Sequence, residues 1–324
     1  MDLPRISIVI PTYNSERTLT QCLESVRQQD YPRDKIEIII VDGGSSDKTV
    51  EIGKKFNVDK VLQNKRRHFI YGKSIGVDSA EHPLTLLLDS DNILPLKSWL
   101  RDMVKPFEDP EIVGSEPISF TYRQTDPLVT RYCALMGVSD PLCLYLGNFD
   151  HICLFKEKWT DLPLKTISRD SYIKIELDGI HTPTLGANGT ILYTELIKKT
   201  AHYKPFFDVD LIHELAGKGY NRFAKVHIGI VHLYAENLTQ FVRKKLRQAR
   251  DFYLYRHLRN YPGYKQQIKL LSFILATITI VGTARDSNRG YQKVPDKAWF
   301  LHPIICLLTL MVYGTMATWK ALAR

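Results

Sequence analysis

The segment LTLLLDSDN, from Leu84 to Asn92, is an apolar run of strand length that ends in two carboxylates, Asp89 and Asp91. A continuous apolar run is typical of a strand that is buried on both faces of a sheet. The two carboxylates are spaced i and i+2, so on extended backbone they point to the same side. Hard oxygen ligands of this kind suit Mg²⁺ or Mn²⁺. An Asx turn at the start of a helix is the alternative interpretation.

Two similar runs precede this segment, ISIVI at 6–10 and IEIIIV at 36–41. Amphipathic stretches with a helical period lie between the runs, at 15–29, 48–56 and 71–80. Alternating strands and helices predict an α/β fold with a mostly parallel central sheet flanked by helices, and ligands that bind at the carboxyl ends of the strands. Beyond about residue 115 the pattern is irregular and predicts no strands.

Composition restricts the class of protein. The chain has 324 residues, of which 44% are hydrophobic and 24% charged, which excludes simple disorder and collagen-like sequence. Its five cysteines form no CxxC pair, which disfavours a zinc site and a disulfide framework and favours a reducing compartment.

The excess positive charge lies in one part of the chain. The formal net charge is +9, and Lys225 to Lys269 holds ten Lys or Arg but only two acids, Glu236 and Asp251. Two apolar runs follow this stretch, so we expect it to bind anionic membrane lipids and not nucleic acid.

The first apolar run, Leu270 to Ala284, would form about 22 Å of helix, which is short for a hydrocarbon core of roughly 30 Å. The second, Ala298 to Trp319, has no formal charge and would form about 33 Å of helix. Two arrangements are open: both helices span the membrane, or the first lies in the interface and only the second inserts. A buried core helix is the alternative for each run. The N-terminus shows no signal peptide, so the part before these helices is expected to be cytoplasmic.

The loops after the first two strands are rich in turn-forming residues. The first strand ends in Pro11-Thr12-Tyr13-Asn14, where a proline and an aromatic residue suit a slot for a flat base. The second ends in Val41-Asp42-Gly43-Gly44, where the glycines let backbone approach a ligand and Asp42 can accept hydrogen bonds from a base or ribose. Ordinary turns are the alternative for both.

The order of four motifs resembles the family 2 glycosyltransferases, which have the GT-A fold. The motifs are IVIPTYNSE (8–16), VDGGSSDKT (41–49), YGKSIG (71–76) and LLLDSDN (86–92). The resemblance implies that one group of residues holds the nucleoside: Pro11, Tyr13, Glu16 and Asp42. It also implies that Lys73 approaches the diphosphate, and that Asp89, Ser90 and Asp91 serve ribose and metal. Gly43 and Lys73 differ from the usual pattern, which has a second acid and an Arg at these positions.

The resemblance continues toward the acceptor half. LGANGT (185–190) is similar to the acceptor-side loop of the family, and FDVDL (207–211) matches the site where an acidic pair supplies the base. Aligned there, Asp208 is the implied base, Asp210 is the next candidate, and Phe207 replaces the other acid. Two acids in the first turn of a helix that ends at Gly219 are the alternative interpretation.

His232 completes the implied site, because similar enzymes often place a histidine near the diphosphate or the metal. We therefore expect Asp91, Asp89 and His232 to be the ligands of Mn²⁺ or Mg²⁺, although a lone histidine is often structural.

These residues imply a metal-dependent, inverting hexosyltransferase. It would move a sugar from a GDP- or UDP-sugar to a lipid-linked acceptor in the membrane, such as a polyprenyl phosphate or a lipid-linked glycan. The alternative is a catalytically inactive, membrane-anchored protein that binds nucleotide sugars, because Phe207 stands where an acid is expected.

The expected domains are a GT-A catalytic domain at 1–235, basic amphipathic interface helices at 236–269, and a membrane helical hairpin at 270–324. Within the catalytic domain, 1–115 is the nucleotide-binding half and 116–235 the acceptor half.

Overall fold

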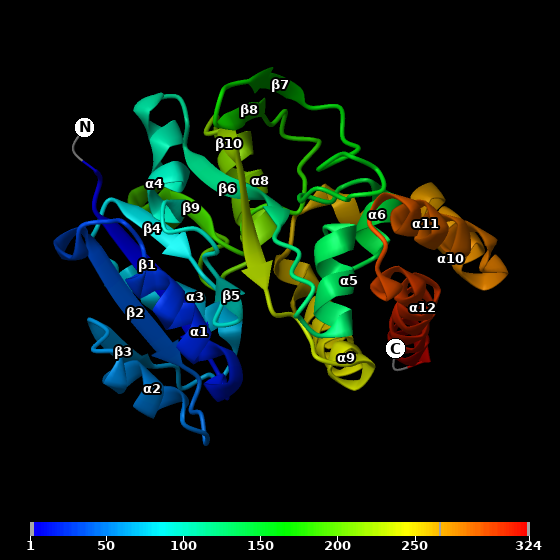
Figure 1. The fold of residues 1–324 in the computed structure, drawn as a ribbon, viewed down its shortest axis with the longest axis horizontal. Helices are drawn as coiled ribbons and strands as arrows, with labels where there is room; N and C mark the ends of the chain where they lie inside the picture. Colours follow the sequence, from blue (N-terminus) through cyan, green and yellow to red (C-terminus); the bar gives the residue numbers. More distant parts are fainter. Residues whose placement is uncertain (1–2, 266, 323–324) are drawn as a thin grey trace. The chain divides into compact units, whose positions relative to one another are not determined.

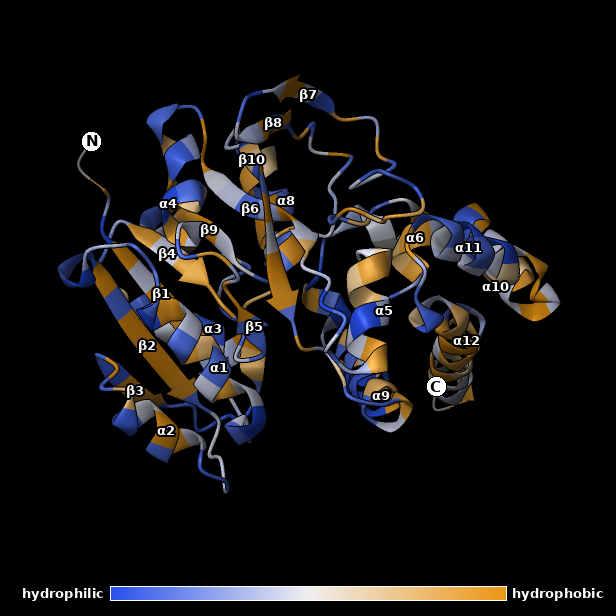
Figure 2. Ribbon diagram, in the orientation of Figure 1, coloured by the Kyte–Doolittle hydropathy of each residue, from blue (hydrophilic) through white to orange (hydrophobic). Residues whose placement is uncertain are grey.

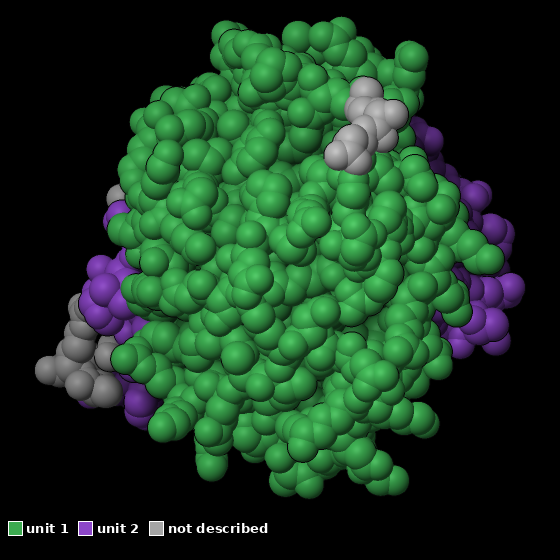
Figure 3. Space-filling model, turned by 90° about the vertical axis from the view of Figure 1, so that its left-hand side faces the viewer, with its two compact units in different colours: residues 1–118, 163–232 green, residues 119–162, 233–324 purple. Residues whose placement is uncertain are grey.

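The computed structural model describes residues 3–265 and 267–322 (Figure 1). The chain forms two compact units, which Figure 3 shows in green and purple. Unit 1 comprises 1–118 and 163–232, and unit 2 comprises 119–162 and 233–324. The functional division into 1–235, 236–269 and 270–324 stays a prediction, and residues 1–2, 266 and 323–324 of those ranges lie outside the described residues.

The first half of unit 1 confirms the predicted α/β pattern. Parallel strands lie in the order β3-β2-β1-β4, with helices between them along the chain. Strands β1 and β2 are buried along their whole length, which explains their uninterrupted apolar sequence. The elements are β1 (Ile6–Thr12), α1 (Glu16–Arg27), β2 (Ile36–Asp42), α2 (Thr49–Lys55), β3 (Lys60–Gln63), α3 (Phe69–Ser79) and β4 (Leu84–Leu87).

The second half of the sheet is not parallel. From β4 it continues in the order β9-β6-β10-β8-β7, with antiparallel pairing of β4 with β9, β9 with β6, β10 with β8 and β8 with β7. The prediction of a mostly parallel sheet is therefore wrong here, and the sheet is mixed. The strands are β5 (Asn92–Ile93), which pairs with β10, and β6 (Gly114–Phe120), β7 (Lys165–Ser168), β8 (Tyr172–Glu176), β9 (Thr190–Tyr193) and β10 (Arg222–His232).

The helices of this half position the site. Helix α8 (Asp208–Gly217) begins at the predicted residue, and Gly219 ends it with φ of 88°. The amide of Tyr220 donates to the Leu215 carbonyl oxygen, which confirms the predicted glycine cap. The other helices are η1 (Arg33–Lys35), α4 (Trp99–Val104), η2 (Lys105–Glu108) and α7 (Thr194–Lys198).

Unit 2 is helical. Its core gathers aromatic side chains from several helices and from the loop after α6, among them Tyr132, Phe149, Phe241 and Trp299. The predicted basic helix is α9 (Leu238–Tyr255), which Asn237 caps by accepting a hydrogen bond from the Gln240 amide at 3.0 Å. The other helices are α5 (Leu128–Met136), α6 (Leu142–Leu146), η3 (Arg256–Leu258), η4 (Pro262–Lys265), α10 (Gln267–Thr279), α11 (Val281–Lys293), η5 (Lys297–Leu301) and α12 (His302–Leu322).

The first apolar run is not one helix. It breaks at Ile280, where φ is 62°, and α10 and α11 are bent by 84°. Helix α11 continues beyond Ala284, where the apolar run ends, to Lys293. The reason is packing: a Cβ at Gly290 would lie 2.3 Å from the Trp299 ring, so only a glycine lets that ring cover α11.

The second apolar run is continuous. The helical segment Lys297–Trp319 has the length and apolar composition to cross a membrane, although 28% of its apolar 18-residue stretch is buried inside the structure. Helices α10 and α11 would form a second membrane crossing only if the two helices together make one bent span.

Candidate active site

The loops after β1 and β2 are joined by hydrogen bonds. The Gly43 amide donates to the Thr12 carbonyl at 2.8 Å, and the Ser46 amide donates to Asn14 Oδ1 at 2.9 Å. Asn14 has φ of 48°, a left-handed conformation that Asn adopts more readily than most residues. The two loops that the sequence assigns to the nucleoside therefore form one surface.

Three predicted nucleoside residues lie between the end of β1 and the start of α1. Pro11 is buried, and a Cβ at Gly72 of α3 would lie only 3.1 Å from its Cβ. Tyr13 is 54% exposed and presents an aromatic ring to solvent. Glu16 is exposed, and its Oε2 accepts a hydrogen bond from the Lys48 amide at 3.1 Å. Their contact with a nucleoside stays a prediction.

Asp42 orders the loop that it belongs to. Its Oδ2 accepts hydrogen bonds from the amides of Gly44 and Ser45, both at 2.8 Å. Its Oδ1 accepts from the hydroxyl groups of Thr12 at 3.1 Å and Ser45 at 2.5 Å. Because the carboxylate is buried and holds four hydrogen bonds, it fixes the turn whether or not it also contacts a ligand.

The loop after β4 is held by a buried asparagine. Asn92 is 0% exposed, and its Oδ1 accepts a hydrogen bond from the Asp89 amide at 3.1 Å. Its Nδ2 donates to Asn188 Oδ1 at 3.3 Å, which ties this loop to the 185–190 loop. The hydroxyl groups of Ser90 and Ser15 lie 2.9 Å apart, so the loop is also tied to the start of α1. These bonds fix the carboxylates at the carboxyl end of β4.

Lys73 lies between two of the predicted site acids. Its Nζ is 2.8 Å from Asp208 Oδ1 and 3.6 Å from Asp89 Oδ1. The Lys73 side chain is 3% exposed, whereas those of Asp208 and Asp89 are 19% and 32% exposed. Burial disfavours the charge of Lys73, but the two carboxylates outweigh it and raise the pKa of the ammonium above its ordinary value. The lysine is therefore a permanent cation that joins the β4 loop to α8.

Asp91 faces a different partner. His232 Nε2, at the end of β10, lies 3.6 Å from Asp91 Oδ1. The backbone brings them together, because His232 pairs with Asn92 in the antiparallel β10–β5 ladder. The predicted set of metal ligands is thus divided: Asp91 lies with His232, and Asp89 lies with Lys73.

No three His, Cys, Asp or Glu side chains within 3–265 and 267–322 converge into a site that could hold a metal by themselves. Mg²⁺ and Mn²⁺ at phosphate sites use one or two carboxylates and complete their coordination with waters and phosphate oxygens. Asp91 with His232 fits that kind of site. Cys22, whose Sγ lies 3.9 Å from the Asp89 carbonyl oxygen, does not, because burial and the charges of Asp91 and Asp89 raise the pKa of its thiol.

The two candidates for the base differ in accessibility. Both acids lie in the first turn of α8, where the helix dipole favours negative charge. Asp210 is 0% exposed, whereas Asp208 reaches Lys73 and solvent. Phe207, the N-cap residue, is buried at 6% exposure. The geometry therefore favours Asp208 over Asp210 as the group that meets a substrate.

The 185–190 loop packs directly under Asp208. Gly186 has φ of 113°, and a Cβ there would lie 2.8 Å from the Asp208 carbonyl oxygen. The Gly186 amide donates to Glu116 Oε1 at 3.1 Å, and Glu116 Oε2 accepts from Lys225 Nζ at 2.7 Å. Glu116 and Lys225 are almost completely buried, at 3% and 0% exposure, and this ion pair supports the loop from the sheet.

Sequence reasoning missed Asn92, Glu116 and Lys225 as parts of the site. Asn92 stands within the quoted LLLDSDN motif, so the motif itself was the signal for it. Glu116 and Lys225 are 109 residues apart and become neighbours only in the antiparallel half of the sheet. No local pattern could have paired them.

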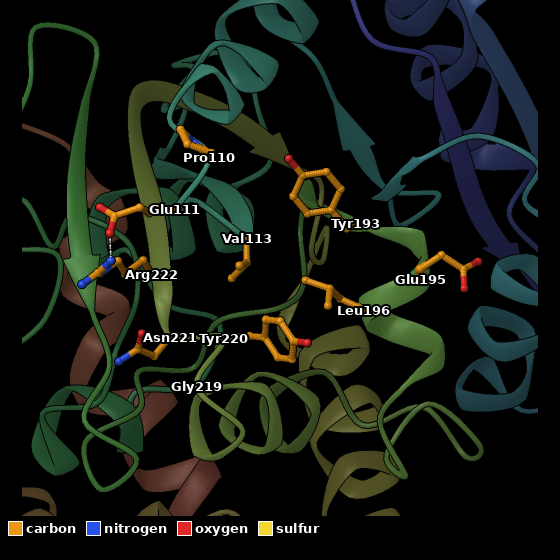
Figure 4. Close-up of a pocket in the computed structure, with 10 residues that line it drawn as sticks. All are labelled: Pro110, Glu111, Val113, Tyr193, Glu195, Leu196, Gly219, Tyr220, Asn221 and Arg222. Carbon is orange, nitrogen blue, oxygen red and sulfur yellow. Dashed lines mark ion pairs between the residues drawn. The ribbon is translucent and has the colours of Figure 1, made fainter.

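A separate cavity of about 520 Å³ lies elsewhere in unit 1 (Figure 4). It is bordered by Tyr193, which pairs with Leu84 at the start of β4, so it lies at the opposite end of that strand from Asp89. Figure 4 shows the rings of Tyr193 and Tyr220 and the ion pair of Glu111 with Arg222. None of the predicted site residues lines it.

The first part of the chain is similar in sequence to known glycosyltransferases. The sequence profile of "Glycosyl transferase family 2" matches residues 7–155. The glycosyltransferase AglE of Haloferax volcanii is 29% identical over 137 residues, which cover 40% of this chain and 44% of AglE. The dolichyl N-acetyl-alpha-D-glucosaminyl phosphate 3-beta-D-2,3-diacetamido-2,3-dideoxy-beta-D-glucuronosyltransferase of Methanococcus voltae is 33% identical over 120 residues, 34% of this chain and 37% of that protein. The chain thus matches less than half the length of these two relatives.

The fold agrees with a solved structure over most of the chain. The mannosyltransferase PcManGT of Pyrobaculum calidifontis, solved with GDP-Man and Mn²⁺, superposes with a TM-score of 0.53 at 16% identity, covering 98% of this chain and 83% of that one. This likeness supports a GT-A-like α/β fold with a mixed sheet. The matched profile contains the four motifs that carry the resemblance, together with Lys73, Asp89 and Asp91 of the site. Residues 7–155, slightly less than half of the chain, therefore match the profile of glycosyl transferase family 2.

Proposed function

We propose that this protein is a glycosyltransferase that moves a hexose from a nucleotide-sugar donor to a lipid-linked acceptor. One observation carries the proposal: the Lys73 ammonium joins Asp208 to Asp89 at the carboxyl end of β4, beside Asp91 and His232. This edge is where open α/β sheets bind ligands. It holds an accessible carboxylate, a fixed cation and two groups suited to a metal.

The donor would bind across the joined β1 and β2 loops. Pro11, Tyr13, Glu16 and Asp42 would hold the nucleoside, with the exposed Tyr13 ring offering a stacking surface to the base. Ser90 and Asp89 follow at the end of β4, within reach of the ribose side of such a ligand. The GDP-Man complex of PcManGT supports a nucleoside diphosphate sugar as the class of donor.

Asp208 would act as the general base of an inverting displacement. The carboxylate takes the proton of the acceptor hydroxyl as that oxygen attacks the anomeric carbon, and the bond to the diphosphate breaks on the opposite side. A base in this role contributes roughly 10² to 10⁴ in rate. Lys73 orients Asp208 through the 2.8 Å ion pair, and its charge lies close to where negative charge grows on the leaving group. Asp210 is the weaker candidate because it is buried.

Asp91 and His232 would hold Mn²⁺ or Mg²⁺, with Asp89 nearby. When bound, such an ion neutralises the negative charge of the diphosphate. The Mn²⁺ of the PcManGT complex supports a divalent metal, and the site chemistry described above fits one.

The acceptor would be a polyprenyl phosphate or a lipid-linked glycan at the cytoplasmic face of a membrane. The name of the Methanococcus voltae relative, which is a dolichyl-phosphate sugar transferase, supports this class of acceptor. The exposed apolar side chains of α10 and α12 support a location at a membrane.

The proposal is tested by incubating the full chain with a panel of nucleotide sugars, Mn²⁺ and membrane lipid extract. Released nucleoside diphosphate and sugar label in the lipid phase are measured in the same sample. We expect one donor to give both in equal amounts. Donor binding without either product would contradict sugar transfer and would favour an inactive nucleotide-sugar binding protein. That alternative is motivated by Phe207, which is buried and stands where an acid is expected.

A further inference from the structure

Helix α9 has a basic face and a buried face. The buried face consists of Phe241, Lys245 and Ala249, spaced four residues apart. The exposed residues include Arg243, Arg247 and Arg250 with Leu246 and Leu254 among them. Basic residues interleaved with exposed leucines are typical of a helix that lies on an anionic lipid surface.

The buried face of α9 packs along α12, and a polar contact fixes the register of the two helices. Lys245 Nζ lies 3.2 Å from Asp140 Oδ2, and the hydroxyl group of Tyr313 on α12 donates to the same oxygen. Lys245 is 0% exposed, and the carboxylate raises the pKa of its ammonium even though burial opposes the charge. This part of α9 therefore lies beside Tyr313.

That register conflicts with a membrane-spanning α12. The apolar segment Lys297–Trp319 has its centre near Leu308, and Tyr313 lies about five residues, or roughly 7 to 8 Å, beyond it. A hydrocarbon core extends about 15 Å to each side of its centre. If α12 spanned, Arg243 and Arg247, on the exposed side of α9 beside Lys245, would be placed inside that core. Arginine at such a depth is strongly unfavourable.

Up to Tyr313 the exposed apolar surface of α12 is one-sided, as expected for a helix that lies in a membrane plane. Phe300, Ile304, Leu307 and Met311 follow one stripe along η5 and α12, and all are 46% exposed or more. Tyr132 Oη lies 2.9 Å from His302 Nδ1 on the packed side. Figure 2 shows the alternation of hydrophobic and hydrophilic residues on α9 and the more continuous hydrophobic colour of α12.

Helix α10 carries a second apolar stripe. Leu271, Leu275 and Ile278 are each at least 55% exposed, and Val281, just after the bend, is 73% exposed. The thirteen residues of α10 make about 20 Å of helix, too short to cross a bilayer. Lys269 Nζ donates to the Leu146 carbonyl oxygen, which holds the start of α10 to α6.

We propose that unit 2 is a monotopic membrane module. Helices α9, α10 and α12 lie on one leaflet of an anionic bilayer, with the apolar stripes inserted into it and the arginines of α9 at its headgroups, and α12 does not span. This differs from both arrangements considered from the sequence, in each of which the second apolar run crosses the membrane. It deepens the proposed membrane location, and its test uses no sugar transfer, so it can fail independently of the proposed function.

Topology is tested with the full chain bound to sealed vesicles of phosphatidylcholine and phosphatidylglycerol. Asn288→Cys, on the exposed side of α11, is treated with a membrane-impermeant maleimide, and a C-terminal epitope tag is treated with protease. Glu51→Cys on α2 marks the outer side of the vesicles. The unsubstituted chain measures the background labelling of its own cysteines, most of which are buried.

A monotopic module leaves both Asn288→Cys and the tag accessible on the same side as Glu51→Cys. A protected cysteine with an accessible tag would show a hairpin, and an accessible cysteine with a protected tag would show a single span. Either result overturns the proposal.

The lipid contact is tested by charge reversal. Arg243→Glu with Arg247→Glu should weaken binding to vesicles that contain phosphatidylglycerol by roughly 30-fold or more, because each lost cation costs about fivefold near an anionic surface. Lys54→Glu with Lys55→Glu, two exposed cations of α2, is the matched control and should leave binding unchanged. Equal binding of the two double variants would overturn the headgroup contact.

Discussion

The Nζ atom of Lys73 lies 2.8 Å from Oδ1 of Asp208, although the two residues are 135 positions apart in the sequence. The pair joins α3, in the half of the domain that we expect to bind the nucleotide, to α8, in the half that we expect to bind the acceptor. The sequence assigned the lysine to the diphosphate and the aspartate to the acceptor, as separate functions. Their contact leads us to propose that the Lys73 ammonium acts in both functions.

Replacing Lys73 by Met should lower sugar transfer at least 100-fold, because Asp208 and Asp89 lose the cation that orients them. Lys73→Arg should retain more activity, because it keeps the charge but not the shape of the ammonium. The measurement is kcat with donor and lipid acceptor. Lys204→Met, which breaks the exposed pair with Asp78, is the control and should be close to wild type. Equal activity of Lys73→Met and Lys204→Met would contradict the role of the pair.

Replacing Asp91 by Ala should reduce turnover at least as much as Asp208→Asn, because Asp91 with His232 would hold the ion that neutralises the leaving diphosphate. Rates of nucleotide release at increasing Mn²⁺ compare the two variants. Excess Mn²⁺ should partly restore Asp91→Ala and have no effect on Asp208→Asn. Near wild-type turnover of Asp91→Ala without added metal would refute the metal role.

Gly186→Ala should disturb α8 at Asp208. The added Cβ would lie 2.8 Å from the Asp208 carbonyl oxygen on a backbone with φ of 113°, which costs about 1 to 3 kcal/mol and displaces the base. Gly217→Ala, where nothing lies within 4 Å, is the matched control at the other end of α8. Thermal unfolding and kcat are measured for both. Unchanged kcat in Gly186→Ala would argue against contact between this loop and the base.

Glu214 should stabilise α8 in a manner that depends on pH. Partial burial alone would raise the pKa of Glu214, but hydrogen bonds from Lys218, from the amides of Ala201 and His202 and from the His202 ring lower it to about 2. A depressed pKa means that the stabilisation is complete above the ordinary value of 4.5 and is lost as the pH falls from there toward 2. The difference in unfolding free energy between wild type and Glu214→Gln should therefore be constant from pH 7 to about 5 and shrink below it. A difference that grows on acidification would contradict this.

The extent to which the sequence predicted the structure depends on how local the signals are. Strands β1, β2 and β4 were predicted because each is a continuous buried apolar run, and the start of α8 and its end at Gly219 follow from its own turn residues. Strand β7 of the mixed half was missed because it is exposed along its length and shows no apolar run. The bend at Ile280 was missed because apolar composition does not report the left-handed backbone of that residue, which has φ of 62°.

In the candidate site, too, local features were predicted and contacts between distant segments were not. Motif residues such as Asp89 and Asp91 were located correctly at the end of a strand, because spacing along one strand is visible in sequence. The contacts of Lys73 with Asp208 and of Glu116 with Lys225 join distant segments. Such contacts depend on sheet order, which one sequence does not specify.

The most direct test of the central claim is a comparison of wild type and Asp208→Asn for both donor binding and transfer. The variant is nearly isosteric, so nucleotide-sugar affinity should change less than threefold while lipid-linked product falls by roughly 10² to 10⁴. Transfer at the wild-type rate by Asp208→Asn would show that Asp208 is not the base and that the acceptor is activated elsewhere.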